Sequence, residues 1–328
     1  MKTSFQTMSF VFGTDVPNFT SKTTKHRKEC IFPDGKMVNI MNDILHIDNL
    51  CKDYKDFKLD NVSFSIEPGT VMGLIGQNGA GKTTIIRLIM NMVDKTNGKI
   101  TVCGFDNIAD EISVKNKIGY VSDECYLFYN STLAKTAQAC ALAYEEWDKE
   151  KFSKLIKMWD LPEKKKISAF SKGMQTKAML AIALSHKPKL LILDEPTAGL
   201  DPVARIEILD ILREFVADGE RSVLFSTHIT GDLDKIADVI TLIIDGKISE
   251  SMSIDLIEDK YAVISGANDK LTRDNEKYTI GIRKTNAGFE ALVLRENLSK
   301  FDGVSVRNPN VENLLTFSIW QNRKELAV

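Results

Sequence analysis

The chain has 328 residues, of which 43% are apolar and 27% are charged. At roughly 150 residues per domain, this length predicts about two domains with a substantial core, which excludes a disordered tail and a disulfide miniprotein. The 43 Lys and Arg residues against 45 Asp and Glu residues give a net charge of −2, so the chain lacks the basic field of a non-specific nucleic-acid binder. No stretch approaches the ~20 consecutive apolar residues that a membrane span needs, and we expect a soluble protein.

The first 41 residues differ in composition from the rest of the chain. They are rich in Ser and Thr, carry a small basic cluster within Lys25–Lys28, and show no sustained helical or strand period. Phe10–Phe12 is too short for the apolar region of a secretory signal. We therefore expect residues 1–41 to be a disordered leader, and Met37 and Met41 are possible alternative starts.

From Ile44 onwards, short apolar runs alternate with longer amphipathic stretches. Strands that alternate with helices predict a parallel α/β sheet, and the almost purely helical stretch 132–186 is predicted to be inserted into it as a subdomain. After Gly246, short apolar runs punctuated by Gly and Asn predict a small α+β unit, with a terminal helix that begins after Asn310. The predicted strands are Val71–Ile75, Leu190–Leu193, Ser222–Ser226 and Val239–Ile244, and the predicted helices include Thr83–Met92 and Val203–Val216.

The strongest motif lies between the first of these strands and the helix that follows it. Residues 76–83 read Gly-Gln-Asn-Gly-Ala-Gly-Lys-Thr and match the phosphate-loop pattern G-x-x-x-x-G-K-[ST] at every fixed position. Glycines let backbone N–H groups wrap the phosphates of a nucleotide, and the helix N-terminus adds its dipole. We assign Lys82 to the β- and γ-phosphates and Thr83 to Mg²⁺. The predicted nucleotide-binding residues here are Gly76, Gln77, Asn78, Gly79, Ala80, Gly81, Lys82, Thr83 and Thr84.

Two adjacent acids, Asp194 and Glu195, follow the apolar run Leu190–Leu193. A phosphate-loop protein needs an acid at the end of a neighbouring strand to hold Mg²⁺, and a second acid beside it can orient and deprotonate the attacking water. We therefore predict Asp194 to be a metal ligand and Glu195 to be the general base. An ordinary exposed turn after a strand is the alternative, and the phosphate loop upstream argues against it.

With the phosphate loop, the run Leu193–Asp201 and the triplet Ser226–His228 resemble the nucleotide-binding subunit of an ATP-binding cassette (ABC) transporter. The resemblance covers about Ile44 to Lys247, and five motifs fall in the order of that family. It implies a P-loop NTPase fold of ABC type, α/β, with a parallel-sheet core and a helical subdomain. It also implies that two such subunits dimerise head to tail, so that each ATP lies between the phosphate loop of one and the signature motif of the other.

The resemblance implies roles for three further residues. Tyr54 corresponds to the aromatic residue that stacks on adenine, with a structural tyrosine as the alternative. His228 resembles the catalytic switch histidine that touches the γ-phosphate, and it lies at the carboxyl end of a predicted strand, where ligands of open α/β sheets collect. Asp201 matches the loop that crosses the dimer interface.

Two motifs depart from the family pattern. The signature, usually Leu-Ser-Gly-Gly-Gln, reads Phe-Ser-Lys-Gly-Met at 170–174; it keeps Ser171, which can cap the next helix and face the partner's γ-phosphate, and Gly173, which allows close backbone approach. Lys172 either adds charge near the phosphate or is solvated. Asp123 stands where the family has a Gln that contacts Mg²⁺ and the attacking water. Either Asp123 ligates the metal, or the coupling is altered, or it is a plain exposed acid.

The resemblance implies a subunit that hydrolyses ATP with Mg²⁺ and powers a separate multi-span membrane permease. Its second subunit would be another copy of this chain or a paralogue, and the location would be cytoplasmic, peripheral on the inner face of the cell membrane. The part after residue 248 is similar to the appendices of exporters of the bacitracin-resistance and lantibiotic-immunity kind, which favours export. We expect no nucleic-acid partner.

The predicted domains are a leader at 1–41, an ABC ATP-binding domain at 42–248 with a helical subdomain at about 125–186, and an accessory domain at 249–328. Two other functions stay open. A soluble ABC ATPase that acts on ribosomes or DNA is disfavoured by the single cassette and the near-zero net charge. A regulatory module that binds ATP without hydrolysing it is disfavoured because the phosphate-loop lysine, both acids and the switch histidine are present.

Overall fold

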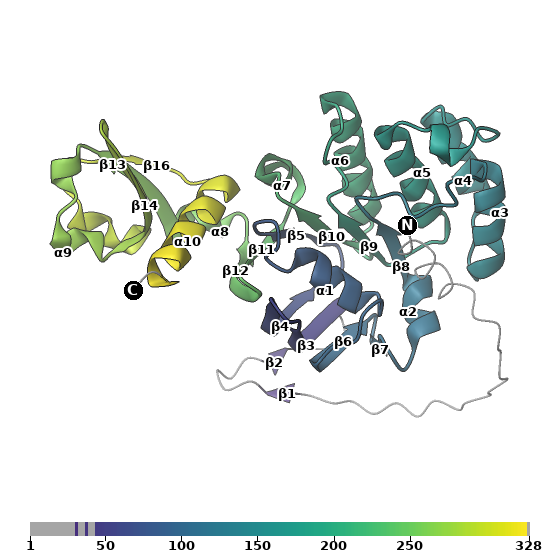
Figure 1. Cartoon of the computed structure of the whole chain (residues 1–328), viewed down its shortest axis with the longest axis horizontal. Coiled ribbons are helices and arrows are strands. Elements are labelled where there is room, and N and C mark those ends of the chain that lie inside the picture. Colours follow the sequence, from purple (N-terminus) through teal and green to yellow (C-terminus); the bar gives the residue numbers. More distant parts are fainter. Residues whose placement is uncertain (1–29, 32–36, 39–42, 327–328) are drawn as a thin grey trace.

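The computed structural model describes residues 30–31, 37–38 and 43–326 (Figure 1). Within the predicted leader it shows two short antiparallel strands, β1 (Cys30–Ile31) and β2 (Met37–Val38). The rest of the expectation for residues 1–41 lies outside the described residues. Three larger sheets organise the remainder of the described chain.

The central sheet has six strands in the order β12-β11-β5-β10-β9-β8. Five of them run parallel, and β12 runs antiparallel to β11 at one edge. The inner strands are almost wholly buried because both faces of the sheet are covered, and the predicted parallel core is confirmed. The strands are β5 (Val71–Ile75), β8 (Ile118–Val121), β9 (Leu190–Asp194), β10 (Ser222–Thr227), β11 (Val239–Ile244) and β12 (Lys247–Ser253).

The chain reverses between β11 and β12 at Asp245 and Gly246, whose φ angles of 45° and 77° suit a tight hairpin. A side chain on Gly246 would overlap the carbonyl oxygen of Lys58, so the turn requires glycine. β12 extends the central sheet as far as Ser253. The predicted boundary between residues 248 and 249 therefore falls inside a strand of this sheet.

A second sheet, in the order β4-β3-β6-β7, is antiparallel and was not predicted. The helix after the phosphate loop, α1 (Lys82–Ile89), packs its apolar face between this sheet and the central one. α1 ends before the predicted Met92 because Asn91 has a φ of 53°, a left-handed conformation that stops a helix. The strands are β3 (Leu45–Asp53), β4 (Lys58–Ile66), β6 (Asn97–Val102) and β7 (Phe105–Asp106).

Helices cover the opposite face of the central sheet, and α3 (Leu133–Ala143), α4 (Lys149–Met158) and α5 (Lys172–Ser185) lie within the stretch that was predicted to be helical (Figure 1). Each of these three helices begins at a residue whose side chain caps the first turn: Thr132, Asp148 and Ser171 each accept a hydrogen bond from a backbone N–H three residues on. α6 (Pro202–Val216) and α7 (Thr230–Ile236) also cover this face, whereas α2 (Glu111–Lys117) packs Val114 into the core on the side of α1.

The C-terminal part is α+β, as predicted, with an antiparallel sheet in the order β14-β15-β13-β16. Its last helix, α10 (Val311–Leu326), packs on β14 and also on α7, and so joins this part to the central sheet (Figure 1). The other elements are α8 (Leu256–Lys260), β13 (Tyr261–Gly266), α9 (Arg273–Glu276), β14 (Thr279–Thr285), β15 (Gly288–Leu294) and β16 (Ser305–Arg307).

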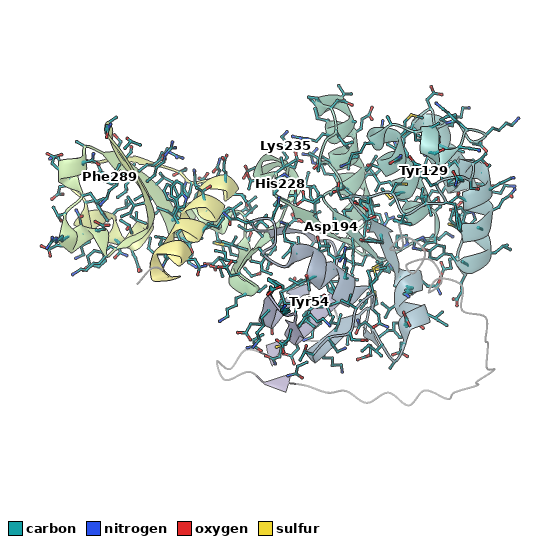
Figure 2. The ribbon with its side chains drawn as sticks, viewed as in Figure 1. Tyr54, Tyr129, Asp194, His228, Lys235 and Phe289 are labelled. Atoms are coloured by element: carbon teal, nitrogen blue, oxygen red, sulfur yellow. The ribbon has the colours of Figure 1, made fainter. Side chains whose placement is uncertain are left out.

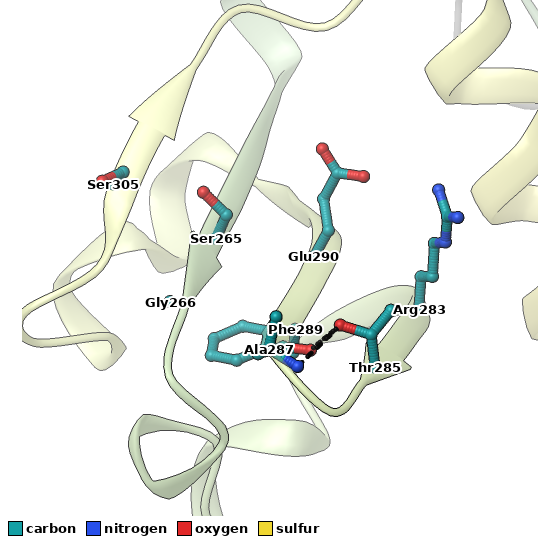
Figure 3. Close-up of a pocket in the computed structure, with 9 residues that line it drawn as sticks. Ser265, Gly266, Arg283, Thr285, Ala287, Phe289, Glu290 and Ser305 are labelled. Carbon is teal, nitrogen blue, oxygen red and sulfur yellow. Dashed lines mark hydrogen bonds between the residues drawn. The ribbon is translucent and has the colours of Figure 1, made fainter.

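A shallow groove of about 380 Å³ crosses this C-terminal sheet. Figure 3 shows polar side chains along it, among them Ser265, Arg283 and Glu290. Cross-strand pairing places these residues in one row, Ser265 opposite Glu290 and Glu290 opposite Arg283. Throughout the described chain, no helix is both long and apolar enough to pass through a bilayer.

Candidate active site

The predicted phosphate loop, both acids, Asp123 and His228 lie at the carboxyl ends of the parallel strands, the edge where open α/β sheets bind ligands. The phosphate loop follows β5, Glu195 follows β9, His228 follows β10, and Asp123 lies just after β8. Figure 2 marks Asp194 and His228 in this region. From the sequence, the acids were expected at the end of a strand next to the phosphate-loop strand. The structure instead places β10 between β5 and β9.

The phosphate loop is shaped by close contacts at two of its glycines. A Cβ on Gly76 would overlap the carbonyl oxygen of Ile243 in β11. Gly81 has a φ of 117°, and a Cβ there would lie 3.0 Å from the ring of Phe57 and 3.1 Å from the side chain of Ile243. The loop backbone can therefore approach a ligand closely while β11 and the β3–β4 turn hold it from behind.

Lys82 is buried at the start of α1, with 6% of its surface exposed. Its Nζ donates hydrogen bonds to the carbonyl oxygens of Gly76, at 2.8 Å, and Gln77, at 3.3 Å. Burial lowers the pKa of Lys82, and the carboxylates of Glu195 and Asp194 oppose that shift. The ammonium is thus fixed over the loop, where a triphosphate would add negative charge.

Asp194 is 5% exposed, and its Oδ1 makes no hydrogen bond with the described residues. Burial raises the pKa of Asp194 above the usual carboxyl range, and the hydroxyls of Thr83 and Ser226 partly oppose this. A buried carboxylate oxygen without a partner, next to a hydroxyl, fits a hard cation such as Mg²⁺. No cluster of three or more His, Cys, Asp or Glu side chains that could hold a metal occurs in the described residues. A cation held by Asp194 could take its other ligands from the Thr83 hydroxyl, phosphate oxygens and water.

This burial predicts a stability effect. Because burial raises its pKa, Asp194 holds its proton more tightly in the folded than in the unfolded chain. The free energy of unfolding should therefore fall as the pH rises through the raised pKa of Asp194. Asp194→Asn removes this pH dependence because the amide carries no charge. Calorimetry without metal should give wild type and variant similar melting temperatures at about pH 4. At about pH 7, the variant should have a higher melting temperature than wild type. A lower melting temperature of the variant at the higher pH would contradict the burial argument.

Glu195 adopts a strained backbone conformation, with a φ of 52°, that brings its carboxylate between two other site residues. Its Oε2 lies 2.7 Å from His228 Nδ1 and also accepts the backbone N–H of His228 at 3.3 Å. Its Oε1 lies 3.8 Å from Lys82 Nζ. A mostly buried carboxylate held in this way can accept a proton from a water molecule placed next to a phosphate.

In the signature segment, Ser171 has the expected capping geometry, and the close approach expected at Gly173 stays a prediction. Ser171 caps α5, since its Oγ accepts the N–H of Met174 at 3.3 Å. Gly173 faces Leu200, whose Cδ2 would lie 3.7 Å from an added Cβ. Asp123 contacts this segment through Lys172, with 2.7 Å between Oδ1 and Nζ. The role of Asp123 as a metal ligand stays a prediction.

Tyr54 lies in the turn between β3 and β4 and is 46% exposed. Its ring centroid is 6.5 Å from that of Phe57, the residue that packs against Gly81 of the phosphate loop. The exposed ring is thus next to the loop, and adenine stacking stays a prediction. Thr84 follows Thr83 in the first turn of α1, and both are half-buried.

Two supporting contacts escaped the sequence reasoning. Phe57 packs behind the phosphate loop, and only its closeness to Tyr54 could have suggested this. Asp232, in the first turn of α7, accepts a hydrogen bond from the Thr197 hydroxyl at 2.8 Å, and both side chains are buried. This bond fixes the segment that follows Glu195, and no spacing rule pairs two residues 35 positions apart.

A phosphate loop after one parallel strand and an acid pair after another define a P-loop nucleoside triphosphatase. Residues 59–198 match the ABC transporter family. The ABC transporter ATP-binding protein YxlF of Bacillus subtilis is 34% identical over 213 residues, which cover 63% of this chain and 70% of that protein. The chain therefore belongs to the ATP-binding subunits of ABC transporters, a family of ATPases.

Other proteins share this fold and family. The bacitracin transport ATP-binding protein BcrA of Bacillus licheniformis is 29% identical over 218 residues, 66% of this chain and 71% of its own. A solved dimer of the ATP-binding cassette MJ0796, bound to ADP and phosphate, has a TM-score of 0.58 at 22% identity. The structural match covers 64% of this chain and 98% of the cassette. The predicted ABC-type fold is thereby confirmed.

Proposed function

We propose that this subunit hydrolyses ATP to drive export through a separate membrane permease. The observation that carries the proposal is the convergence of Lys82, Asp194, Glu195 and His228 at one edge of the central sheet. All four groups needed to bind and cleave a triphosphate are present, so a module that only binds ATP is the weaker interpretation. Export, rather than import, follows from the resemblance of the C-terminal part to the appendices of exporters of the bacitracin-resistance and lantibiotic-immunity kind, and one relative is a bacitracin transport ATP-binding protein.

In this proposal each residue has a defined task. Thr83 and Asp194 hold Mg²⁺, which neutralises charge on the phosphates when bound. Glu195 accepts the proton of the attacking water. His228 contacts Glu195 through Nδ1, so its other ring nitrogen, Nε2, is the atom available to the γ-phosphate. An N–H at Nε2 would donate a hydrogen bond to a γ-phosphate oxygen and stabilise the charge that develops there.

We further propose that two cassettes close head to tail on ATP, the second being another copy or a paralogue. Ser171 and Gly173 would then face the phosphates held by the other subunit. The N-terminus of α5, where Ser171 is the cap, is suited to an anion because backbone N–H groups point outwards there. The dimer of the solved cassette with this fold is in line with this arrangement.

The helices between residues 125 and 186 offer apolar side chains to a membrane partner. Leu142 on α3 is 90% exposed, and Met158 at the end of α4 and Tyr129 in the turn before α3 are more than half exposed. Figure 2 marks Tyr129. Large exposed apolar side chains are typical of protein contacts. We propose that this surface docks the permease and so places the subunit on the cytoplasmic face of the cell membrane.

Purification from solubilised membranes tests this proposal. A tagged chain is expected to bring down one multi-span membrane protein. The double variant Tyr129→Glu/Leu142→Glu should lose most of it, because charges at the contact must be desolvated. The matched control is Leu256→Glu/Val306→Glu, which alters two exposed residues of the C-terminal part and should retain the partner. Recovery of ribosomes or DNA without a membrane protein would contradict the proposal and favour the soluble ATPase.

A further inference from the structure

The two residues that depart from the family pattern contact each other. Asp123 follows β8 and Lys172 is the first residue of α5, 49 positions later, yet Oδ1 and Nζ form an ion pair at 2.7 Å. About half of each side chain is exposed, 49% for Asp123 and 44% for Lys172. Asp123 replaces a neutral amide of the family pattern and Lys172 replaces a glycine, so the two departures carry opposite charges and contact each other.

The stem of Lys172 also reaches a third segment. Its Cδ and Nζ lie 3.6 and 3.8 Å from where a Cβ on Gly199 would be, so the side chain passes over the backbone of that glycine. Gly199 has a φ of 72° and lies between the catalytic Glu195 and Asp201. The Lys172 side chain therefore touches the segments after β8 and after β9 from the start of α5.

Electrostatics explains why the two charges occur together. A cation in the first turn of a helix is unfavourable because the N-terminus of the helix dipole is positive. α5 has no acidic residue in its first turn to compensate Lys172. Asp123 supplies that charge from outside the helix, and its own negative charge is neutralised in return. Either charge alone would be uncompensated.

We infer that Asp123 acts as the partner of Lys172 and not as a metal ligand, and that the pair positions the signature segment against the segment 196–201. The contact keeps the segment after β8, the start of α5 and the segment after β9 in fixed positions relative to one another while the nucleotide is hydrolysed. Asp123 and Lys172 are positioning residues in this scheme, and the inference rests on the proposed hydrolytic function of the site.

A double-mutant cycle tests the pair, with Asp123→Asn, Lys172→Met, both together, and the exchanged pair Asp123→Lys/Lys172→Asp. We expect each single variant to lower the rate of ATP hydrolysis roughly two- to fivefold, the range of a partly exposed ion pair. The double variant should be no slower than the singles, and the exchanged pair should recover most of the rate. Lys189→Met, which breaks the exposed pair with Glu220, is the control and should leave the rate unchanged.

Two further readouts separate positioning from metal ligation. The affinity for Mn²⁺–ADP, followed by electron paramagnetic resonance, should stay within about twofold of wild type in every variant, because metal contacts are intact. Hydrogen exchange at the Leu200 amide, which donates to Thr197, should rise equally in both single variants. A loss of Mn²⁺–ADP affinity in Asp123→Asn alone, or additive effects in the cycle, would overturn the inference. If wild type hydrolyses no ATP, the proposed function fails, whereas the exchange measurement still decides whether the pair exists.

Discussion

Replacement of Glu195 by Gln is expected to slow ATP hydrolysis about a hundredfold or more while leaving ATP binding intact. General bases typically contribute 10²- to 10⁴-fold to a rate, and an amide cannot take the proton of water. The amide oxygen can still accept the two hydrogen bonds that His228 makes with Glu195, so the local geometry should survive. A steady-state phosphate-release assay, with ATP affinity measured by calorimetry, checks both parts of the expectation.

Glu220→Gln serves as the matched control for this variant. It makes the same chemical change at a side chain that is 70% exposed and paired with Lys189, and it should leave the rate unaltered. Two results would contradict the assignment. A Glu195→Gln variant as fast as wild type would show that another group is the base, and negligible hydrolysis in both would favour a regulatory module that binds ATP without turnover.

The second large effect is expected at Lys82. Lys82→Met keeps the length of the buried stem but removes an ammonium that should donate charged hydrogen bonds to the β- and γ-phosphates. Hydrogen bonds to charged groups contribute about 1.5–3 kcal/mol, so ATP affinity should fall roughly 10- to 100-fold. The apolar replacement also ends the desolvation of a buried charge, and the variant is therefore expected to fold.

Calorimetric titration with ATP measures the change at Lys82, and circular dichroism checks the fold. Lys58→Met removes a lysine that is well exposed and paired with Asp60, and its ATP affinity should equal that of wild type. An unchanged affinity in Lys82→Met would mean that the phosphates bind elsewhere. The proposed site would then be wrong even if hydrolysis were observed.

The elements that the sequence predicted best are those whose pattern is local. The phosphate loop needs glycines at fixed spacing between a strand and a helix, and the acid pair needs an apolar strand before it. β11 was predicted to the residue because its apolar run is bounded on both sides by turn-forming residues. In each case the chemistry that identifies the element lies within about ten consecutive residues.

The antiparallel sheet of β3, β4, β6 and β7 shows why other parts were missed. β3 and β4 carry polar and charged residues, and their register shifts where Asn49 and Asn61 take φ angles of 50° and 55°. Such strands show no clean period of two, and β6 joins them from more than 40 residues away. Pairing across this separation decides the sheet, and a single sequence does not record it.

Within the site, the missing information was again contact between distant segments. Glu195 and His228 were both selected from sequence, yet their 2.7 Å contact depends on a left-handed backbone at Glu195 that no propensity favours. Asp123 and Lys172 were each noted as departures, and only the fold brings them together. Residue types were therefore predictable here, and their partners were not.

In the proposed mechanism, Lys82 holds ATP and Glu195 helps to cleave it between two cassettes. Sedimentation of the Glu195→Gln variant at saturating ATP tests this directly. The variant is expected to sediment as a dimer with ATP and as a monomer with ADP, and the added Lys82→Met change should abolish the dimer. A monomer at saturating ATP, or a dimer that persists without Lys82, would contradict the account.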